Sequence, residues 1–347
     1  MNILRQHSFL IILIIAFSSG CRKMIRLDPP TTQLVSSSAF SNNDNAAAVL
    51  TGIYTDMIAE GAFGGFMSVS AVGSLASDEF VAYEAFIFDY NIVISQAYRN
   101  SLNSGNVPFW RTLYNYIYRS NAAIEGLNTS TGVTPAMKDQ LTGEAKFIRA
   151  FCHFYLVNLF GEVPLITTTD YRVNRRAIRT SKNEVYTQII DDLKEAEALL
   201  NSDYLSADNS VTEEKVRPNK FAAMALLARV YLYTNDWQNA EAKASEVIES
   251  QKYFLVTEPD NVFIKNSVEA IWQLPPVLAG YNTLDGYQFT LTGAPNYNTP
   301  ISLSSLLTDQ FADEDRRRAE WVGSVTDNGT TYYFPTKYNV AVYNEPV

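Results

Sequence analysis

Two apolar stripes separated by a short polar turn restrict what residues 220–250 can fold into. Within each stripe, apolar or small residues recur every three or four positions, the period of a helix face that packs against a neighbour. The first stripe is Met224, Leu227, Ala228 and Tyr231, and the second is Ala240, Ala244 and Val247. Because the alanines are small, the two helices can approach each other closely. The spacing therefore predicts a helix pair, the unit from which helical-repeat scaffolds are built.

Helical patterns also cover most of residues 41–200. A stripe predicts a first helix over 41–60, and a second pattern begins at Pro108. Thr134 and Pro135 are typical of a helix start. The run 147–156 is apolar nearly all round, so its helix should be buried between others. Ser181 and Glu184 form a capping box before another amphipathic run. We predict a mostly α fold: a tetratricopeptide-like helical repeat scaffold with a loop-rich, minor-β C-terminal subdomain.

The N-terminus indicates secretion and lipid anchoring. Arg5 and the apolar run 9–17 make residues 1–20 a signal peptide, and this run is about half the roughly 20 residues that a membrane span requires. The sequence Ser18-Ser19-Gly20-Cys21 resembles a bacterial lipobox, in which the cysteine is acylated. The alternative is an ordinary signal peptide with a chance cysteine. Since the chain has only 2 Cys, Cys21 and Cys152, an acylated Cys21 leaves no disulfide partner.

The chain divides into four stretches by composition. Residues 1–20 are the signal peptide and 21–40 a polar, proline-containing tether. Residues 41–255 are the helical region, which contains an inserted aromatic loop at 61–106. Residues 256–347, rich in Pro, Gly, Asn and Thr, are predicted to form a loop-rich ligand-binding subdomain with short β-like or irregular pieces such as 268–274.

Aromatic residues outside the helices predict where a ligand binds. Tyr 21, Phe 19 and Trp 4 make 13% of the chain, and such rings stack on the apolar face of a pyranose. Any single ring can instead fill the core. Long connections that are too aromatic for disorder are usually functional. The candidate ligand contacts are Asp78, Tyr83, Phe86, Tyr90, Asn91, Tyr98, Tyr281, Tyr287 and Tyr297.

Composition argues against several function classes. A net charge of -10 disfavours nucleic acid as a partner. The chain has 2 His, of which one precedes Cys21 and the other, His153, lies in the predicted buried helix, so we expect no histidine-based catalysis, metal site or cofactor. Paired carboxylates could still hydrolyse a glycoside, and Asp78 with Glu79 is the pair to test. Arg316, Arg317 and Arg318 follow three acids, which predicts local ion pairs instead of an anion site.

Three motifs resemble the SusD/RagB family of outer-membrane lipoproteins. Trp110, Tyr114, Ile117, Asn121, Ala122 and Ile124 form the first. The stretch 144–151, running on to Phe160-Gly161-Glu162-Val163-Pro164-Leu165, forms the second. The third is Ala222, Ala225 to Tyr233, Asp236, Trp237 and Ala240.

The resemblance implies a helical, tetratricopeptide-like protein with a surface lipid anchor and a SusC-like TonB-dependent transporter as its partner. In that family the helical motifs are structural and variable loops form the pocket, so no pocket residue is assigned by motif. Family members continue past a segment like 332–338 into another helix pair, so we expect 256–347 to be C-terminally incomplete.

We therefore expect a non-catalytic protein of the outer membrane that binds a nutrient, such as a glycan or oligosaccharide, and delivers it to that transporter. Two alternatives stay open at this point: a carboxylate-dependent glycoside hydrolase, and a periplasmic tetratricopeptide scaffold that binds protein segments.

Overall fold

The structure is a computed structural model that describes residues 38–59, 62–83, 108–277 and 280–342. The chain separates into two units, Met1–Ala39 and Phe40–Val347, and the second contains every helix and strand described below. The predicted signal peptide, Cys21 and nearly all of the predicted tether lie outside the described residues. None of the helices in the described ranges combines the length and apolarity needed to cross a bilayer.

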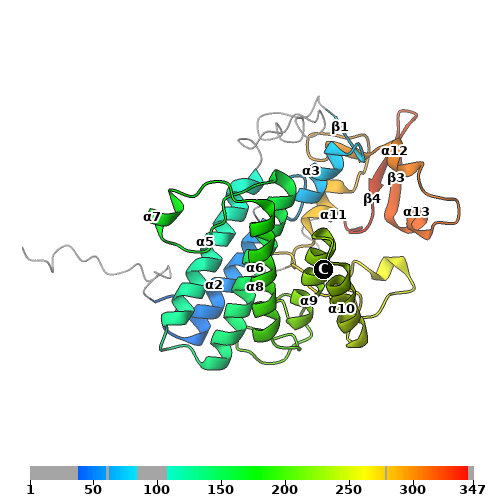
Figure 1. Ribbon diagram of the computed structural model, residues 1–347. Helices are drawn as coiled ribbons and strands as arrows, with labels where there is room; N and C mark the ends of the chain where they lie inside the picture. The colour runs from blue at the N-terminus through cyan, green and yellow to red at the C-terminus, as the bar shows by residue number, and fades with distance from the viewer. Residues whose placement is uncertain (1–37, 60–61, 84–107, 278–279, 343–347) are drawn as a thin grey trace, which may run out of the picture. The chain divides into compact units, whose positions relative to one another are not determined.

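Six helices form the main body of the second unit (Figure 1). They are α2 (Asn43–Ala59), α5 (Pro108–Thr129), α6 (Pro135–Phe160), α8 (Lys182–Leu199), α9 (Lys220–Tyr233) and α10 (Trp237–Glu249). From α5 onward each of these helices packs against the next, and α2 packs against α5 and α6. Neighbour-to-neighbour packing of antiparallel helices is the arrangement of a helical repeat. The predicted tetratricopeptide-like scaffold is confirmed.

Local capping sets the starts of these helices. Ser181 caps α8: its Oγ accepts from the Glu184 N–H at 3.4 Å, and it also donates to the Glu184 carboxylate at 2.5 Å. The predicted pairing of these two residues is therefore present. Pro135 occupies the first turn of α6, where a missing N–H costs nothing.

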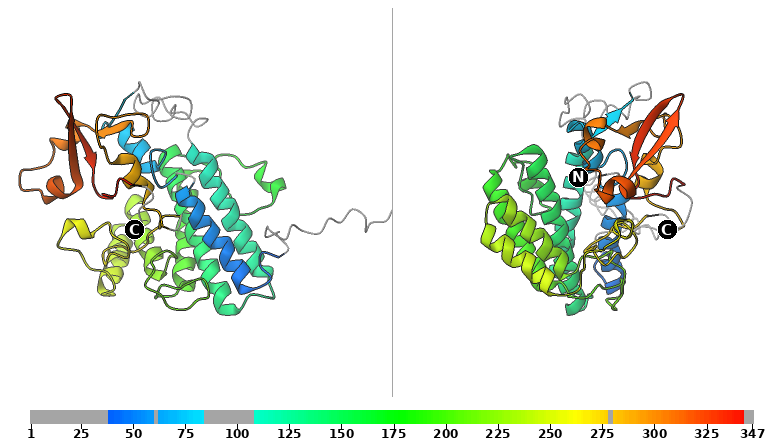
Figure 2. Two further views of the ribbon diagram at one scale, coloured as in Figure 1. Left: turned by 180° about the vertical axis from the view of Figure 1, so that it is seen from behind. Right: turned by 90° about the vertical axis from the view of Figure 1, so that its right-hand side faces the viewer.

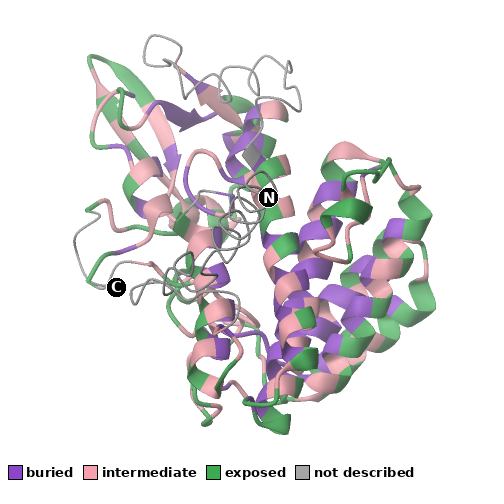
Figure 3. Ribbon diagram, turned by 90° about the vertical axis from the view of Figure 1, so that its left-hand side faces the viewer, coloured by how far each residue is buried: buried purple, intermediate pink, exposed green. Residues whose placement is uncertain are grey.

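Helix α6 is the central element of the helical body. Most of its residues between Met137 and Val157 are buried, on several sides of the helix, because α5 and α8 cover it. Figure 3 shows buried residues on the helix faces that meet and exposed ones on the outer faces. Gly143 lies where α6 meets the end of α8, and a Cβ there would come within 2.9 Å of Leu200 Cγ. The close approach of these two helices therefore depends on a glycine.

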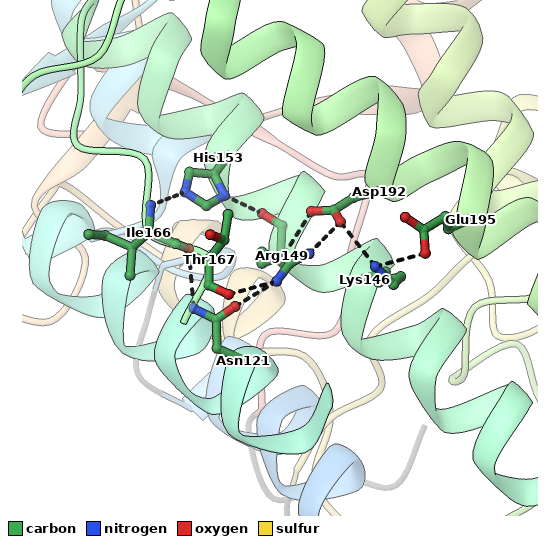
Figure 4. A network of polar contacts seen from close by, with 8 residues as sticks. All are labelled: Asn121, Lys146, Arg149, His153, Ile166, Thr167, Asp192 and Glu195. Carbon is green, nitrogen blue, oxygen red and sulfur yellow. Dashed lines mark hydrogen bonds and ion pairs between the residues drawn. The ribbon is translucent and has the colours of Figure 1, made fainter. Parts of the chain in front are cut away.

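A buried polar network crosses this helical body (Figure 4). Arg149 Nε donates to Asp192 at 2.7 Å and Arg149 Nη1 donates to Asn121 Oδ1 at 2.8 Å, joining α6 to α8 and α5. His153 Nδ1 lies 3.0 Å from the Arg149 carbonyl, and His153 Nε2 lies 3.5 Å from the Ile166 nitrogen. Burial lowers the pKa of His153 to about 4. The histidine is thus a neutral, fully buried structural residue, as predicted.

A second buried network joins α2 to the segment before α9. The Glu144 carboxylate accepts from Tyr54 Oη at 2.7 Å, from Gln140 Nε2 at 2.9 Å and from Arg217 Nε at 2.8 Å. All four side chains are buried. A buried carboxylate is tolerated because hydrogen bonds and an opposite charge replace its hydration.

A small antiparallel sheet lies outside the helical body. Its strands are β1 (Phe80–Ala82), β2 (Ile301–Leu303), β3 (Val322–Asp327) and β4 (Thr330–Pro335), in the order β1-β2-β4-β3. Asn328 and Gly329, both with positive φ, make the tight turn between β3 and β4. The predicted minor-β content is confirmed, although residues 268–274 are irregular and the strands lie elsewhere.

Short helices complete the structure in places where irregular chain was expected. Helix α3 (Val69–Ala76) falls inside the predicted aromatic loop 61–106, and Ser68 caps it by accepting from the Ala71 N–H at 3.1 Å. Helix α11 (Leu284–Phe289) falls inside the loop-dominated C-terminal stretch. The remaining short elements are α7 (Tyr171–Asn174), η4 (Pro259–Asn261), α12 (Ser305–Thr308) and α13 (Arg316–Trp321). These elements are too short for a clear periodic signal.

Candidate functional site

A cavity of about 470 Å³ lies between α3, the sheet and the short C-terminal helices. Cavities of roughly 300 to 1,000 Å³ hold small ligands. Two stretches far apart in sequence line it, residues 68–80 and residues 285–338. Aromatic rings contribute to the wall at Phe80, Phe289, Phe311, Trp321 and Tyr338, and charged groups contribute at Glu79, Asp285, Arg317 and Lys337. This mixture of rings and convergent polar groups is typical of a binding site.

The pairing of β1 with β2 brings the two stretches together. Phe80 lies opposite Leu303 in the register, and the Ser304 N–H donates to the Glu79 carbonyl at 2.9 Å. Ser304 Oγ also donates to the Asp78 carbonyl at 2.5 Å. These hydrogen bonds hold the backbone of residues 78–80 against the C-terminal part of the chain.

Aromatic packing positions the floor of the cavity. Phe80 stacks on Phe289 of α11, with ring centroids 5.6 Å apart and an interplanar angle of 27°. Phe66 meets the same Phe289 ring edge-on at 5.4 Å. The turn that contains Phe66 is fixed by Gln288, whose Oε1 accepts from the Phe66 N–H at 2.8 Å. Helix α11 therefore anchors this wall.

Trp321 and Lys337 stand next to each other because β3 and β4 are paired. Val322 lies opposite Pro335, and the Thr336 N–H donates to the Trp321 carbonyl at 2.9 Å. The Lys337 ammonium lies 5.2 Å from the centroid of the Trp321 ring and 5.2 Å from that of Phe263, within cation–π range. The Trp321 indole N–H donates to the Pro259 carbonyl at 3.1 Å, which fixes the ring.

The charged side chains of the cavity wall differ in whether they already have hydrogen-bond or ion-pair partners within the protein. Arg317 is bound to Asp315, with Nε 2.9 Å from Oδ1, and this hydrogen bond raises the pKa of Arg317. Glu79 accepts from Ser74 Oγ at 2.7 Å. Burial raises the pKa of Asp285, while a hydrogen bond from the Gly65 backbone opposes that shift. Within the described ranges, no carboxylate oxygen lies within 4.0 Å of the Lys337 ammonium. Lys337 is therefore able to donate to a ligand.

Five of the predicted ligand contacts lie in the described residues. Asp78 is exposed and has a positive φ of 62°. Tyr83 is half-buried, with its hydroxyl 3.3 Å from Ser302 Oγ and its ring 5.8 Å from that of Tyr332. Tyr281, Tyr287 and Tyr297 are 36%, 40% and 48% exposed, which leaves part of each ring at the surface.

The other predicted positions lie outside the described residues. These are Phe86, Tyr90, Asn91 and Tyr98 of the aromatic loop, together with the lipidation site Cys21. A local ion pair beside the triple arginine is present between Arg317 and Asp315, as predicted, whereas Arg316 pairs with Glu258, which is distant in sequence.

Sequence reasoning did not identify most of the cavity. Asp285, Phe289, Trp321 and Lys337 were not predicted as ligand contacts, although Tyr287, which lies between Asp285 and Phe289 on α11, was. Phe311, Trp321 and Tyr338 carried an available signal, since they are aromatic residues in the stretch predicted to be loop-rich. In the part of the chain that the structure describes, no group of three or more His, Cys, Asp or Glu side chains could hold a metal ion.

The chain is similar in sequence to known proteins of the SusD-like family. Residues 36–232 match the sequence model of the SusD-like family described as "Starch-binding associating with outer membrane". A SusD-like protein P2 of Formosa agariphila is 28% identical over 283 residues, covering 77% of this chain and 52% of that relative. The starch-binding protein SusD of Bacteroides thetaiotaomicron is 30% identical over 153 residues, covering 41% and 25%. The chain spans about half, or less, of the length of the curated relatives that it matches.

The fold is also found among solved structures. A laminarin-binding SusD-like protein superimposes with a TM-score of 0.69 at 22% sequence identity, covering 86% of this chain and 72% of that one. At this identity the similarity shows a shared fold.

Proposed function

Because this chain belongs to the SusD-like family, which is described as starch-binding and associated with the outer membrane, we propose that it binds a glycan at the cell surface. The bound glycan would pass to a SusC-like TonB-dependent transporter, without chemical change by this protein. The anchor in this proposal is an acylated Cys21, which holds the protein to the outer membrane with its binding site facing the exterior.

The observation that carries the proposal is the cavity beside Trp321. A pyranose has an apolar face that stacks on a ring and hydroxyls that need hydrogen-bond partners. The cavity offers both, because Trp321 and Phe311 line it together with Glu79, Asp285 and Lys337. Its size suits a short stretch of a longer glycan. The relatives named as starch-binding and laminarin-binding make a glucan the first ligand to test.

The remaining predicted contacts extend this site in the proposal. Tyr281, Tyr287 and Tyr297 offer partly exposed rings in the same C-terminal stretch as α11. Asp78 and Tyr83 flank β1, which supplies one wall of the cavity. Phe86, Tyr90, Asn91 and Tyr98 follow β1 in sequence and stay predicted contacts.

Binding can be tested with two matched tryptophan variants. Isothermal titration of starch and laminarin oligosaccharides into the wild-type protein should give measurable affinity. Trp321→Ala should weaken it by about tenfold or more, as loss of a buried aromatic anchor does. Trp237→Ala, on the exposed side of α10, should bind like wild type. Equal affinity in both variants would remove Trp321 and its cavity from the proposal.

The absence of catalysis needs its own experiment. Purified protein incubated with the same glucans should release no reducing ends. Release that Asp78→Ala or Glu79→Ala abolishes would identify a hydrolase instead. If the protein captured assembly factors in a pulldown and bound no glycan, the alternative of a periplasmic scaffold that binds protein segments would be favoured.

Anchoring and delivery are tested in cells. Cys21→Ser should release the protein from the membrane fraction, and affinity purification of the wild type should recover a TonB-dependent transporter. A transporter gene directly beside the gene for this chain would support the same partnership.

A further inference from the structure

A strongly basic segment stands out on a chain whose net charge is -10. Residues 171–179 read Tyr-Arg-Val-Asn-Arg-Arg-Ala-Ile-Arg, with four arginines in eight positions and no acid. All four arginines are exposed. We call residues 171–179 the arginine segment. Local positive charge of this density on an acidic protein indicates an anionic partner.

The arginine segment is held at its base by the helical body. Glu125 of α5 accepts from the Thr169 N–H at 2.9 Å and from Thr168 Oγ1 at 2.9 Å. Asn174 Nδ2 donates to the Thr168 carbonyl at 2.8 Å, and the Thr180 N–H donates to the Val163 carbonyl at 3.0 Å. Both ends of the segment are therefore fixed, and a loop fixed in this way loses little conformational entropy when it binds.

Two of the arginines have no acidic partner nearby. Arg172 pairs with Asp170 at 2.8 Å, and the Arg175 guanidinium lies 6.0 Å from the centroid of the Tyr171 ring. Across the ranges that the structure describes, no carboxylate oxygen lies within 4.0 Å of Arg176 or Arg179. Their donors are available to oxygen atoms of another molecule, and the planar guanidinium suits phosphate in particular.

Apolar side chains are interleaved with the charges. Tyr171 is 73% exposed, Val173 is 57% exposed and Ile178 is 80% exposed. A partner recognised by charge alone gains nothing from exposed aliphatic groups. A lipid surface gains from both, because its phosphates attract arginine while its acyl boundary accepts apolar side chains.

We propose that the arginine segment binds the phosphate-bearing surface of an anionic lipid membrane. The rest of the chain is acidic and would be repelled by such a membrane. Salt limits this repulsion, because at physiological ionic strength charges more than about 8 Å from the membrane surface are largely screened. The segment would then set which side of the helical body faces the lipid.

This binding would not compete with the cavity. In Figures 1 and 2, α7 and α11 to α13 lie on opposite sides of the layer formed by α5, α6 and α8. Both surfaces could be occupied at once. The proposal holds whether or not the cavity binds a glycan.

Vesicle sedimentation tests the proposal with the mature chain, residues 21–347, carrying Cys21→Ser, so that neither the apolar signal peptide nor acylation contributes. We expect binding to vesicles of three parts phosphatidylcholine to one part phosphatidylglycerol and little binding to pure phosphatidylcholine. Arg176→Glu should weaken partitioning by about tenfold, and Arg176→Glu with Arg179→Glu by more. Ile178→Ser should weaken it as well, which a purely electrostatic contact would not show.

The matched control is Lys194→Glu, the same charge change at an exposed position on α8. It should sediment like the parent, and circular dichroism should give all variants the same melting profile. Equal binding to both vesicle types, or equal loss in Lys194→Glu and Arg176→Glu, would overturn the proposal. So would retention on an acidic polysaccharide column by protein that ignores the vesicles, because that result identifies a polyanion as the partner.

Discussion

The ammonium of Lys337 lies 5.2 Å from the centroid of the Trp321 ring at the wall of the cavity. The pairing of β3 with β4 places them side by side, since Trp321 directly precedes β3 and Lys337 closely follows β4 at the same end of the strand pair, where Val322 lies opposite Pro335. The Phe263 ring lies at the same 5.2 Å distance, and among the described residues no carboxylate oxygen lies within 4.0 Å of the ammonium. A ligand in the cavity therefore meets an aromatic ring and an available donor side by side.

Replacing the ammonium should cost affinity without disturbing the ring. Lys337→Met retains most of the aliphatic stem but removes the charge, so we expect about tenfold weaker glycan binding, the loss of one hydrogen bond to a charged group. Titration calorimetry with the ligand found for the wild type measures this change. Lys194→Met, at an exposed position on α8, serves as the control and should bind normally. An unchanged affinity in Lys337→Met would mean that the ligand does not contact this ammonium.

The buried ion pair between Arg149 and Asp192 should be essential for stability. Asp192→Ala leaves the Arg149 and Lys146 charges without their shared carboxylate, so we expect a loss of about 3 to 5 kcal/mol in the free energy of unfolding. Urea denaturation followed by circular dichroism measures it. The adjacent Asp191 is exposed, and Asp191→Ala should change stability by about 0.5 kcal/mol or less. Similar losses in the two variants would show that the pair contributes little.

The helical scaffold could be predicted because its signals are local. Ser181 and Glu184 stand three residues apart, and the stripes from Met224 to Val247 keep one period, so neighbouring residues identify each helix. The pairing of Arg317 with Asp315 was likewise predictable from adjacent charges.

The cavity could not be predicted, because its walls meet only through tertiary structure. Glu79 and Lys337 are separated by most of the chain and are brought near each other by the β1-β2-β4-β3 sheet. The strands involved are three to six residues long, too short for their alternation to identify a partner. Tyr287 could be chosen from the sequence because it is an aromatic residue in a loop-rich stretch. Asp285, on the same helix, has no sequence feature that distinguishes it from other aspartates.

Stability should fall in acid partly because of His153. Burial lowers its pKa to about 4 in the folded protein, whereas an unfolded histidine titrates near 6.5. Between these values the unfolded chain binds more protons, so this contribution is complete above about pH 6.5 and is lost as the pH falls toward 4. His153 therefore lowers the free energy of unfolding by about 3 kcal/mol at most over this pH range.

The variant His153→Gln isolates this contribution, because it cannot take up the proton. Its overall stability should be lower, yet its free energy of unfolding should depend less on pH between 4 and 6.5 than that of the wild type. Urea titrations at several pH values measure both curves. Parallel curves would mean that other groups, chiefly carboxylates, account for the acid sensitivity.

Two glycines on helices should respond in opposite directions to the same substitution. At Gly143 an added Cβ would come within 2.9 Å of the buried Leu200 Cγ, so Gly143→Ala forces α6 and the end of α8 apart and should cost about 1 to 3 kcal/mol. At Gly73 on α3 an added Cβ meets nothing within 4 Å, so Gly73→Ala should stabilise by about 0.5 to 1 kcal/mol through helix propensity alone. Thermal denaturation of both variants decides between packing and propensity, since each substitution removes the same backbone freedom. Stabilisation by Gly143→Ala would mean that α6 and α8 have room for a methyl group at their contact.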